Sequence, residues 1–190
     1  MSPWSGLRRY LAAAAACAAL GVLSFGRNAD VPLLWWVDLG IHEAGHVATL
    51  WLPEIATAMA GSAAQVLVPL ALAAYFALAQ GEVPGAALCA AWAGTSARNA
   101  SVYIADAPAE SLSLVGGGQH DWSFALGPEG LDAMDRAGAI AGTVRGAGLA
   151  LVIVAVAACL AAPVLARRGA GHRWGPAQKG GVSSSWPPGG

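Results

Sequence analysis

The run His42-Glu43-Ala44-Gly45-His46 holds two histidines four residues apart, with a glutamate directly after the first. On a helix this spacing places both imidazole rings on one face, about 5–6 Å apart at Cβ, so that two ring nitrogens can reach one metal ion. Glu43 lies about 100° further round the helix, where it can address a metal-bound water without binding the metal. The pattern therefore predicts a hydrolytic zinc site with His42 and His46 as ligands and Glu43 as general base.

A catalytic zinc usually takes a third protein ligand and keeps one position for water. We favour His120 or Asp121, because the glycine triplet before them lets the chain bend back towards the histidines. Asp121 would also serve as the N-cap of a helix starting at Trp122, which would leave His120 as the freer ligand. Asp106 and Asp132 remain alternatives, so the third ligand is open at this point.

Further residues bear on the same region. Asp38 lies one turn before His42 and could accept the spare ring N–H of a zinc-bound histidine, or it could be a solvated carboxylate. Gly45 removes side-chain bulk beside the site, so that another backbone could approach closely. Other small or polar residues within apolar helices are interpreted as structural, serving helix packing, a kink, a hydrogen bond or an ion pair: Gly61, Ser62, Gln65, Pro69 and Arg98.

The composition is that of a membrane protein. Hydrophobic residues make up 56% of the 190 and charged residues only 11%, against about 25% charged in a typical soluble domain. Residues 10–26, 55–81 and 146–166 carry no Asp, Glu, Lys or Arg, and apolar runs of about 18 or more residues indicate membrane spans. The net charge of −1 gives no electrostatic case for binding nucleic acid.

We expect an all-α, polytopic transmembrane helix bundle of 4–6 membrane helices over residues 1–166. The apolar runs predict helices at about 7–26, 32–52, 55–80, 86–105 and 138–165, although 7–26 could instead be a signal peptide. The acidic, glycine-rich segment 106–136 should lie outside the hydrocarbon or line a cavity. Residues 167–190, rich in Gly, Pro and Ser, predict a disordered tail.

Basic residues near both ends of the chain favour a cytoplasmic position for each end. Arg8 and Arg9 flank the first apolar run, and Arg167 and Arg168 follow the last. Both ends on one side require an even number of crossings, yet there are five apolar segments. One of them must be re-entrant, surface-lying or cleaved, and the segment 32–52, which carries the histidines, is the natural candidate.

The motif His42 to His46 in an apolar helix, flanking spans and a distal aspartate together resemble the site-2-protease-like intramembrane zinc metalloproteases. The segments 61–69 and 116–122, the second ending in His120-Asp121-Trp122, resemble a little-studied bacterial branch of that family. The resemblance covers roughly residues 33–135. It departs from the family at the second motif, usually Leu-Asp-Gly, whose nearest literal match here is Leu131-Asp132-Ala133.

The resemblance implies an integral protein of the bacterial plasma membrane that binds Zn²⁺ and hydrolyses peptide bonds in or near the bilayer. Carried over, His42, His46 and Asp121 bind zinc and Glu43 is the general base. The expected partners are the lipid bilayer and a membrane-associated protein or peptide substrate, with no nucleic acid. The alternative is a non-catalytic membrane protein, either a degenerate relative of these proteases or a scaffold.

Overall fold

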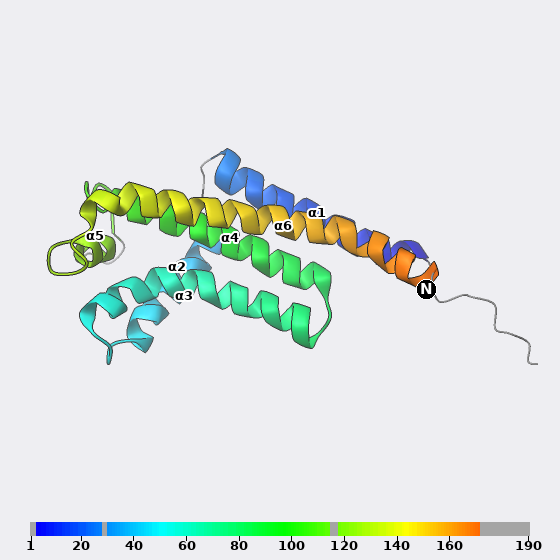
Figure 1. Ribbon diagram of the computed structural model, residues 1–190, viewed down its shortest axis with the longest axis horizontal. Helices are drawn as coiled ribbons and strands as arrows, with labels where there is room; N and C mark the ends of the chain where they lie inside the picture. The colour runs from blue at the N-terminus through cyan, green and yellow to red at the C-terminus, as the bar shows by residue number, and fades with distance from the viewer. Residues whose placement is uncertain (1–2, 28–29, 115–117, 172–190) are drawn as a thin grey trace, which may run out of the picture.

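A computed structural model of the chain describes residues 3–27, 30–114 and 118–171. These residues form helices and connecting turns without any strand, which confirms the all-α prediction (Figure 1). The elements in chain order are α1 (Pro3–Gly21) continued by the π-helix η1 (Val22–Gly26), α2 (Leu34–Ala48), α3 (Glu54–Ala74) continued by the π-helix η2 (Tyr75–Ala79), α4 (Val83–Asp106), α5 (Asp121–Leu126) and the 3₁₀ turn η3 (Met134–Arg136) leading into α6 (Ala137–Gly171).

Four long helices lie side by side along the length of the molecule. α4 packs against α6, α1 and α3, and α2 packs on α3. In Figure 1, α1 and α4 run in one direction, whereas α3 and α6 run in the other. The start of α1 and the end of α6 therefore lie at one end of the bundle, and α5 lies at the opposite end.

Within the described residues, three helices are long and apolar enough to cross a membrane, against the 4–6 predicted, namely Gly6–Gly26, Glu54–Ala79 and Met134–Leu165. α2 has only 15 residues, or about 22 Å at 1.5 Å per residue, against a hydrocarbon core of about 30 Å. The predicted helix over 32–52 was therefore too long at its end. The chain turns after Ala48, where the N–H of Thr49 bonds to the carbonyl of His46, and Pro53 then precedes α3.

Two regions outside the long apolar runs are also helical. The acidic, glycine-rich segment 106–136 contains the short helix α5 and the 3₁₀ turn η3. α6 continues to Gly171, a few residues into the predicted tail. The rest of the predicted tail, residues 172–190, lies outside the described residues, as do Gly116 and Gly117 of the glycine triplet.

α4 and α6 cross at a pair of glycines that lets the two backbones meet. A Cβ atom placed on Gly148 would lie 2.6 Å from the carbonyl oxygen of Gly94, and one on Gly94 would lie 2.5 Å from the carbonyl oxygen of Gly148. Small residues at such crossings let helices of an apolar bundle gain packing contacts. The crossing holds the middle of α4, near its buried polar residues, against α6.

A substitution pair on α6 tests this crossing. Gly148→Ala should lower the free energy of unfolding by about 1–3 kcal/mol, because the added methyl group overpacks the α4 backbone. Gly142→Ala is the matched control, since nothing lies within 4 Å of its Cβ position and alanine has the higher helix propensity. Thermal unfolding in detergent measures both, and equal midpoints for the two variants would contradict the proposed contact.

Candidate metal centre

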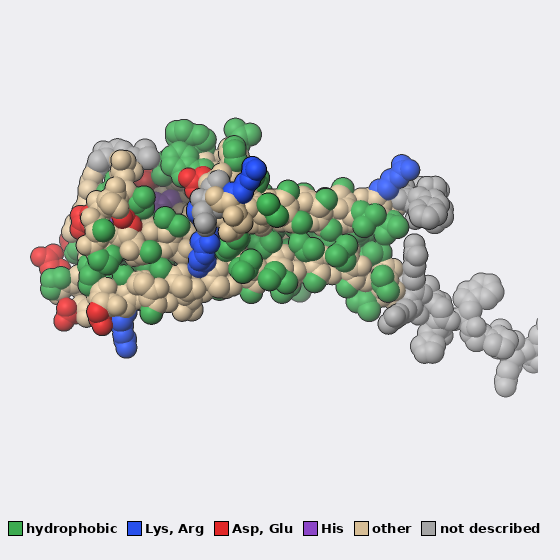
Figure 2. All heavy atoms as spheres, turned by 90° about the horizontal axis from the view of Figure 1, so that it is seen from above, with side chains coloured by type: hydrophobic (Ala, Val, Ile, Leu, Met, Phe, Trp, Pro, Cys, Tyr) green, Lys and Arg blue, Asp and Glu red, His purple; other side chains and the backbone are tan. Residues whose placement is uncertain are grey.

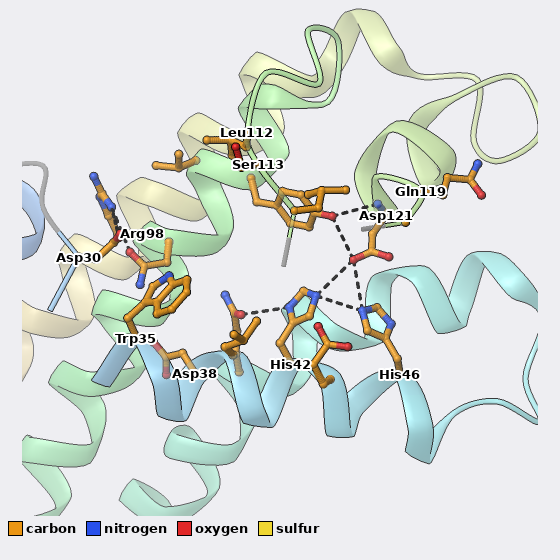
Figure 3. A pocket seen from close by; sticks show the side chains of 18 residues that line it. Asp30, Trp35, Asp38, His42, His46, Arg98, Leu112, Ser113, Gln119 and Asp121 are labelled. Carbon is orange, nitrogen blue, oxygen red and sulfur yellow. Dashed lines mark hydrogen bonds and ion pairs between the residues drawn. The ribbon is translucent and has the colours of Figure 1, made fainter. Parts of the chain in front are cut away.

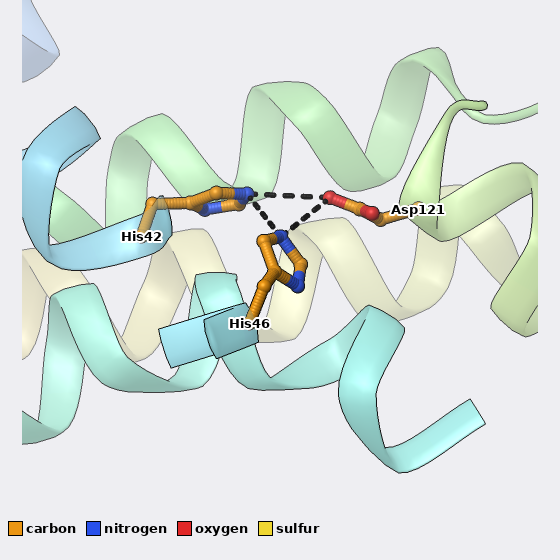
Figure 4. A group of neighbouring side chains, drawn as sticks. All are labelled: His42, His46 and Asp121. Atoms are coloured by element: carbon orange, nitrogen blue, oxygen red, sulfur yellow. Dashed lines mark hydrogen bonds and ion pairs between the residues drawn. The ribbon is translucent and has the colours of Figure 1, made fainter. Parts of the chain in front are cut away.

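Three electron-pair donors from two distant parts of the chain meet at one point (Figure 4). The Nε2 atoms of His42 and His46, both on α2, are 3.0 Å apart. Oδ2 of Asp121, the first residue of α5, lies 3.2 Å from each of them. In a tetrahedral zinc site with bonds of about 2.0–2.1 Å, any two donor atoms are about 3.3–3.4 Å apart. The three atoms thus form nearly one face of such a tetrahedron.

The hydrogen bonds on the far side of each ring fix where its proton sits. Nδ1 of His42 lies 3.2 Å from Oε1 of Gln65 on α3, and the amide nitrogen of Gln65 donates to the carbonyl of Ser96 on α4 at 3.2 Å. Because that carbonyl can only accept, the amide of Gln65 must turn its oxygen towards His42. Nδ1 of His42 therefore carries the hydrogen, and its Nε2 holds a bare lone pair in the neutral ring.

The same reasoning applies to the second histidine. Nδ1 of His46 lies 2.8 Å from the carbonyl oxygen of Thr57, which again only accepts. The side chain of Thr57 in turn donates to the carbonyl of Thr49 at 2.8 Å, which holds the start of α3 against the end of α2. When both rings are neutral, two ring lone pairs and one carboxylate oxygen face one another. A cation at the centre would stabilise this arrangement.

Tyr103 of α4 holds the aspartate in this position. Its hydroxyl accepts the backbone N–H of Asp121 at 3.1 Å and donates to Oδ2 of the same residue at 3.3 Å. One hydroxyl thus fixes both the main chain and the carboxylate of Asp121. Metal-binding carboxylates are commonly oriented by a further hydrogen bond of this kind.

The two neighbours of Asp121 anchor α5 to two other helices. His120 is buried, its Nδ1 accepts the N–H of Ser123, and its Nε2 lies 3.5 Å from Oδ2 of Asp106 at the end of α4. Nε1 of Trp122 donates to the hydroxyl of Ser62 on α3 at 3.0 Å. Three consecutive residues therefore contact α4, the histidines and α3, which leaves little freedom in where the carboxylate of Asp121 lies.

This geometry decides among the candidates for the third ligand. Asp121 joins the two histidines, whereas His120 points away from them and itself provides the N-cap of α5. The expectation that Asp121 would cap a helix starting at Trp122 is wrong, because α5 already begins at Asp121. Asp106 contacts His120 and the backbone of the following loop, and Asp132 is exposed on the turn before η3, so neither reaches the histidines.

Asp38 does not accept the spare N–H of a histidine, because Gln65 occupies that position. It is buried, and its Oδ1 accepts hydrogen bonds from Nε1 of Trp92 at 2.7 Å and from the hydroxyl of Ser96 at 2.9 Å. Burial raises the pKa of the Asp38 carboxyl, and the two hydrogen bonds oppose that rise. Asp38 thus ties α2 to α4 one turn before the histidines.

Two glycines let α2 and α3 approach closely at the metal centre. A Cβ atom on Gly45 would lie 2.7 Å from the carbonyl oxygen of Ala60, which confirms the predicted close backbone approach. A Cβ atom on Gly61 would lie 2.5 Å from Nε2 of His46 and 2.6 Å from Nε2 of His42. Gly61 therefore leaves open the space that a metal ion would share with the ring nitrogens, which the packing interpretation of this residue did not foresee.

Two hollows flank the metal centre. The larger, of about 460 Å³, runs along α2 from Trp35 past Glu43 to His46 and is closed on the other side by α4 and the loop before α5 (Figure 3). The smaller, of about 410 Å³, lies beside the turn between α2 and α3. Both are lined by His46 and Asp121. Glu43 is exposed and lines the larger hollow, where its carboxylate is accessible to water.

Comparison with protein-family models, with curated proteins and with solved structures finds no match to this chain. The class of site therefore follows from its own geometry. Within the described residues, two histidines and one aspartate form a group able to bind a metal ion. Thr57 and Tyr103, which position His46 and Asp121, were not singled out from the sequence. Gly61 and Gln65 were interpreted only as structural residues, although they show the same four-residue spacing on α3 as the histidines show on α2.

A graded series of variants tests the donor set. Replacing a residue that only orients a ligand typically lowers metal affinity by about 10–100-fold. Asp121→Ala should lower the zinc affinity by more than this, because it removes a ligand. Gln65→Leu should fall within that range, since it leaves His42 without its acceptor. Asp132→Ala, the matched control, should bind zinc like the parent protein. Calorimetric titration with Zn²⁺ measures all three, and equal affinities of the two aspartate variants would exclude Asp121 as a ligand.

Gly61→Ala tests the space available for the metal ion rather than the donor atoms. The added methyl group should abolish stoichiometric zinc binding, because it would stand 2.5–2.6 Å from both Nε2 atoms, while helical content stays the same. Gly40→Ala on α2 is the control, since nothing lies within 4 Å of its Cβ position. Metal analysis and circular dichroism of the purified variants give the two readouts. Full zinc content in Gly61→Ala would contradict the assigned metal position.

Proposed function

We propose that this chain is an integral membrane zinc metallopeptidase. The observation that carries the proposal is the group of three candidate donor atoms, two Nε2 and one Oδ2, separated by 3.0–3.2 Å. Zn²⁺ is the ion we assign, because two imidazoles and one carboxylate in a near-tetrahedral arrangement with an open fourth position are typical of catalytic zinc. The residue types agree with those that the resemblance to site-2-protease-like enzymes implies.

A zinc ion held there would polarise a peptide carbonyl and lower the pKa of a bound water towards about 7. The protein residues do the remaining work. Glu43 follows His42 and lines the larger hollow, which supports a role in which its carboxylate would accept a proton from that water and return it to the leaving amine. Gln65 and the carbonyl of Thr57 keep the two rings in the orientation that directs Nε2 towards the ion.

The position between two hollows favours cleavage within a chain rather than at its end. His46 and Asp121 line both cavities, so an extended polypeptide could continue on either side of the scissile bond. Volumes of about 460 and 410 Å³ lie within the range of about 300–1,000 Å³ usual for ligand pockets. We therefore propose an endopeptidase acting on peptide bonds in or near the bilayer.

We further propose that α1, α3, α4 and α6 cross the bacterial plasma membrane and that α2 does not. The three long apolar helices support this arrangement. α4 runs antiparallel to α3 and α6 between them, so it must cross if they do. Four crossings place both ends of the chain on the same side, which agrees with the basic residues near each end.

Glu43→Gln separates an enzyme from a non-catalytic scaffold. The variant should keep full zinc binding, since Glu43 is not among the donor atoms, yet lose peptide hydrolysis by about 10²–10⁴-fold, the usual contribution of a general base. Hydrolysis of a fluorogenic peptide library by protein in detergent measures the loss. If the parent protein binds zinc but its turnover equals that of the variant, the scaffold alternative is correct.

A further inference from the structure

Two ion pairs mark the two edges of an uncharged band across the bundle. At one end Arg9 of α1 pairs with Glu82 at the start of α4, with 3.1 Å between Nη2 and Oε1. At the other end Arg98 of α4 pairs with Asp30, which lies between α1 and α2, with 3.3 Å between Nη1 and Oδ1. Arg145 of α6 lies over the ring of Phe25 at the end of η1, 5.5 Å from its centroid, and it acts electrostatically on Arg98.

The band between these pairs has the dimensions of a bilayer core. The stretch of α4 from Glu82 to Arg98 is about 24 Å long at 1.5 Å per residue, and the exposed side chain of Arg9 extends towards water at one edge, which brings the band closer to the hydrocarbon thickness of about 30 Å. Segments 10–26, 83–97 and 146–166 carry no charged residue. Figure 2 shows hydrophobic side chains covering this half of the molecule, whereas acidic side chains gather on the other half.

The metal centre lies at the edge of this band. His42 contacts Gln65, which bonds to the carbonyl of Ser96, two residues before Arg98. Tyr103, which holds Asp121, is about 7 Å beyond Arg98 along α4 at the helical rise. The three donor atoms therefore lie between the level of Ser96, about 3 Å inside the Arg98–Asp30 pair, and that of Tyr103, about 7 Å outside it, which places them where the hydrocarbon meets the lipid headgroups.

The outer face of α2 fits the same depth. Its inner face presents Asp38, His42 and His46 to the bundle and the hollow, and the exposed Glu43 lies at the border of that face. The other exposed side chains of the helix and its flanking turns are apolar. A short amphipathic helix with tryptophans on its apolar face is typical of the membrane–water interface. The exposed apolar residues are Leu33, Trp36, Val37, Val47, Leu50 and Trp51.

The distribution of charge indicates which side the site faces. The end of the bundle with Arg9 and Glu82 is also the end to which α6 returns. In the sequence, six of the ten basic residues lie near the start of α1, near the end of α6 or beyond it: Arg8, Arg9, Arg167, Arg168, Arg173 and Lys179. Of the 11 acidic residues, only Glu82 belongs to that end. Basic residues flanking spans favour the cytoplasm, so the metal centre faces the opposite side.

We infer that the metal centre opens at headgroup level on the non-cytoplasmic side of the membrane. Its substrates are juxtamembrane segments, that is, extended polypeptide just outside the non-cytoplasmic end of a membrane span. The assignment of substrate class rests on the proposed peptidase function, whereas the assignment of side and depth does not. A site at this level takes unfolded chain from the surface and has no need to unwind a helix in the hydrocarbon.

Cysteine labelling tests the orientation without any assay of activity. In a Cys89→Ser background, Glu129→Cys places a thiol on the exposed turn beyond α5, and Gln80→Cys places one on the exposed turn before α4. A membrane-impermeant maleimide added to intact cells should label Glu129→Cys and spare Gln80→Cys until the membrane is opened. The reverse pattern overturns the orientation, and equal labelling of both in intact cells overturns the membrane arrangement.

Cleavage-site mapping tests the depth and the substrate class. A reporter with one membrane span and an unstructured non-cytoplasmic flank is reconstituted in vesicles with the zinc-loaded protein, and the products are identified by mass spectrometry. The cut should fall within about five residues outside the span and be absent with Glu43→Gln. A cut in the middle of the span overturns the inferred depth. No cut, with zinc bound, overturns the peptidase and its substrate class, while labelling still decides the orientation.

Discussion

The convergence of three electron-pair donors on one point is the interaction on which the rest of this structure depends. Two imidazole nitrogens and a carboxylate oxygen lie within 3.0–3.2 Å of one another because the surrounding protein holds each of them there. It holds the two rings through Nδ1, which faces away from the centre, and the aspartate through its backbone N–H and through Oδ2 itself. Gln65, the carbonyl of Thr57 and the hydroxyl of Tyr103 perform this task, and each belongs to a helix other than the one that carries the donor.

A polar network in an apolar bundle makes this positioning precise. Ser96 of α4 contributes its hydroxyl to Asp38 and its carbonyl to Gln65, so one residue connects α2, α3 and α4. Ser62 receives the indole N–H of Trp122 and connects α5 to α3. An unsatisfied polar group is costly in such surroundings. Alternative arrangements of these helices would leave several such groups unpaired, and the network therefore selects the arrangement that assembles the metal centre.

The short length of α2 links the chemistry to the membrane. A helix of 15 residues cannot cross the hydrocarbon. Asp38, His42 and His46 face inwards, the exposed Glu43 lines the larger hollow, and the other exposed side chains of α2 are apolar. The turn after Ala48 brings His46 beside the first turn of α3, where the carbonyl oxygen of Thr57 accepts its ring N–H. In the arrangement that we propose, the same shortness keeps the zinc site at the surface, where water for hydrolysis is available.

The sequence alone predicted the long helices and the pair of histidine donors, because both follow from local patterns. A long apolar run predicts a helix, and two residues at i and i+4 lie on one face of a helix. It also narrowed the third donor to a few residues but could not choose among them. His120 and Asp121 are adjacent in the chain, and only the anchoring of α5 by Asp106 and Ser62 turns one towards the histidines and the other away. The roles of Gly61 and Gln65 likewise exist only between helices. Tertiary structure decided these points, since contacts between residues far apart in the chain leave no period in the sequence.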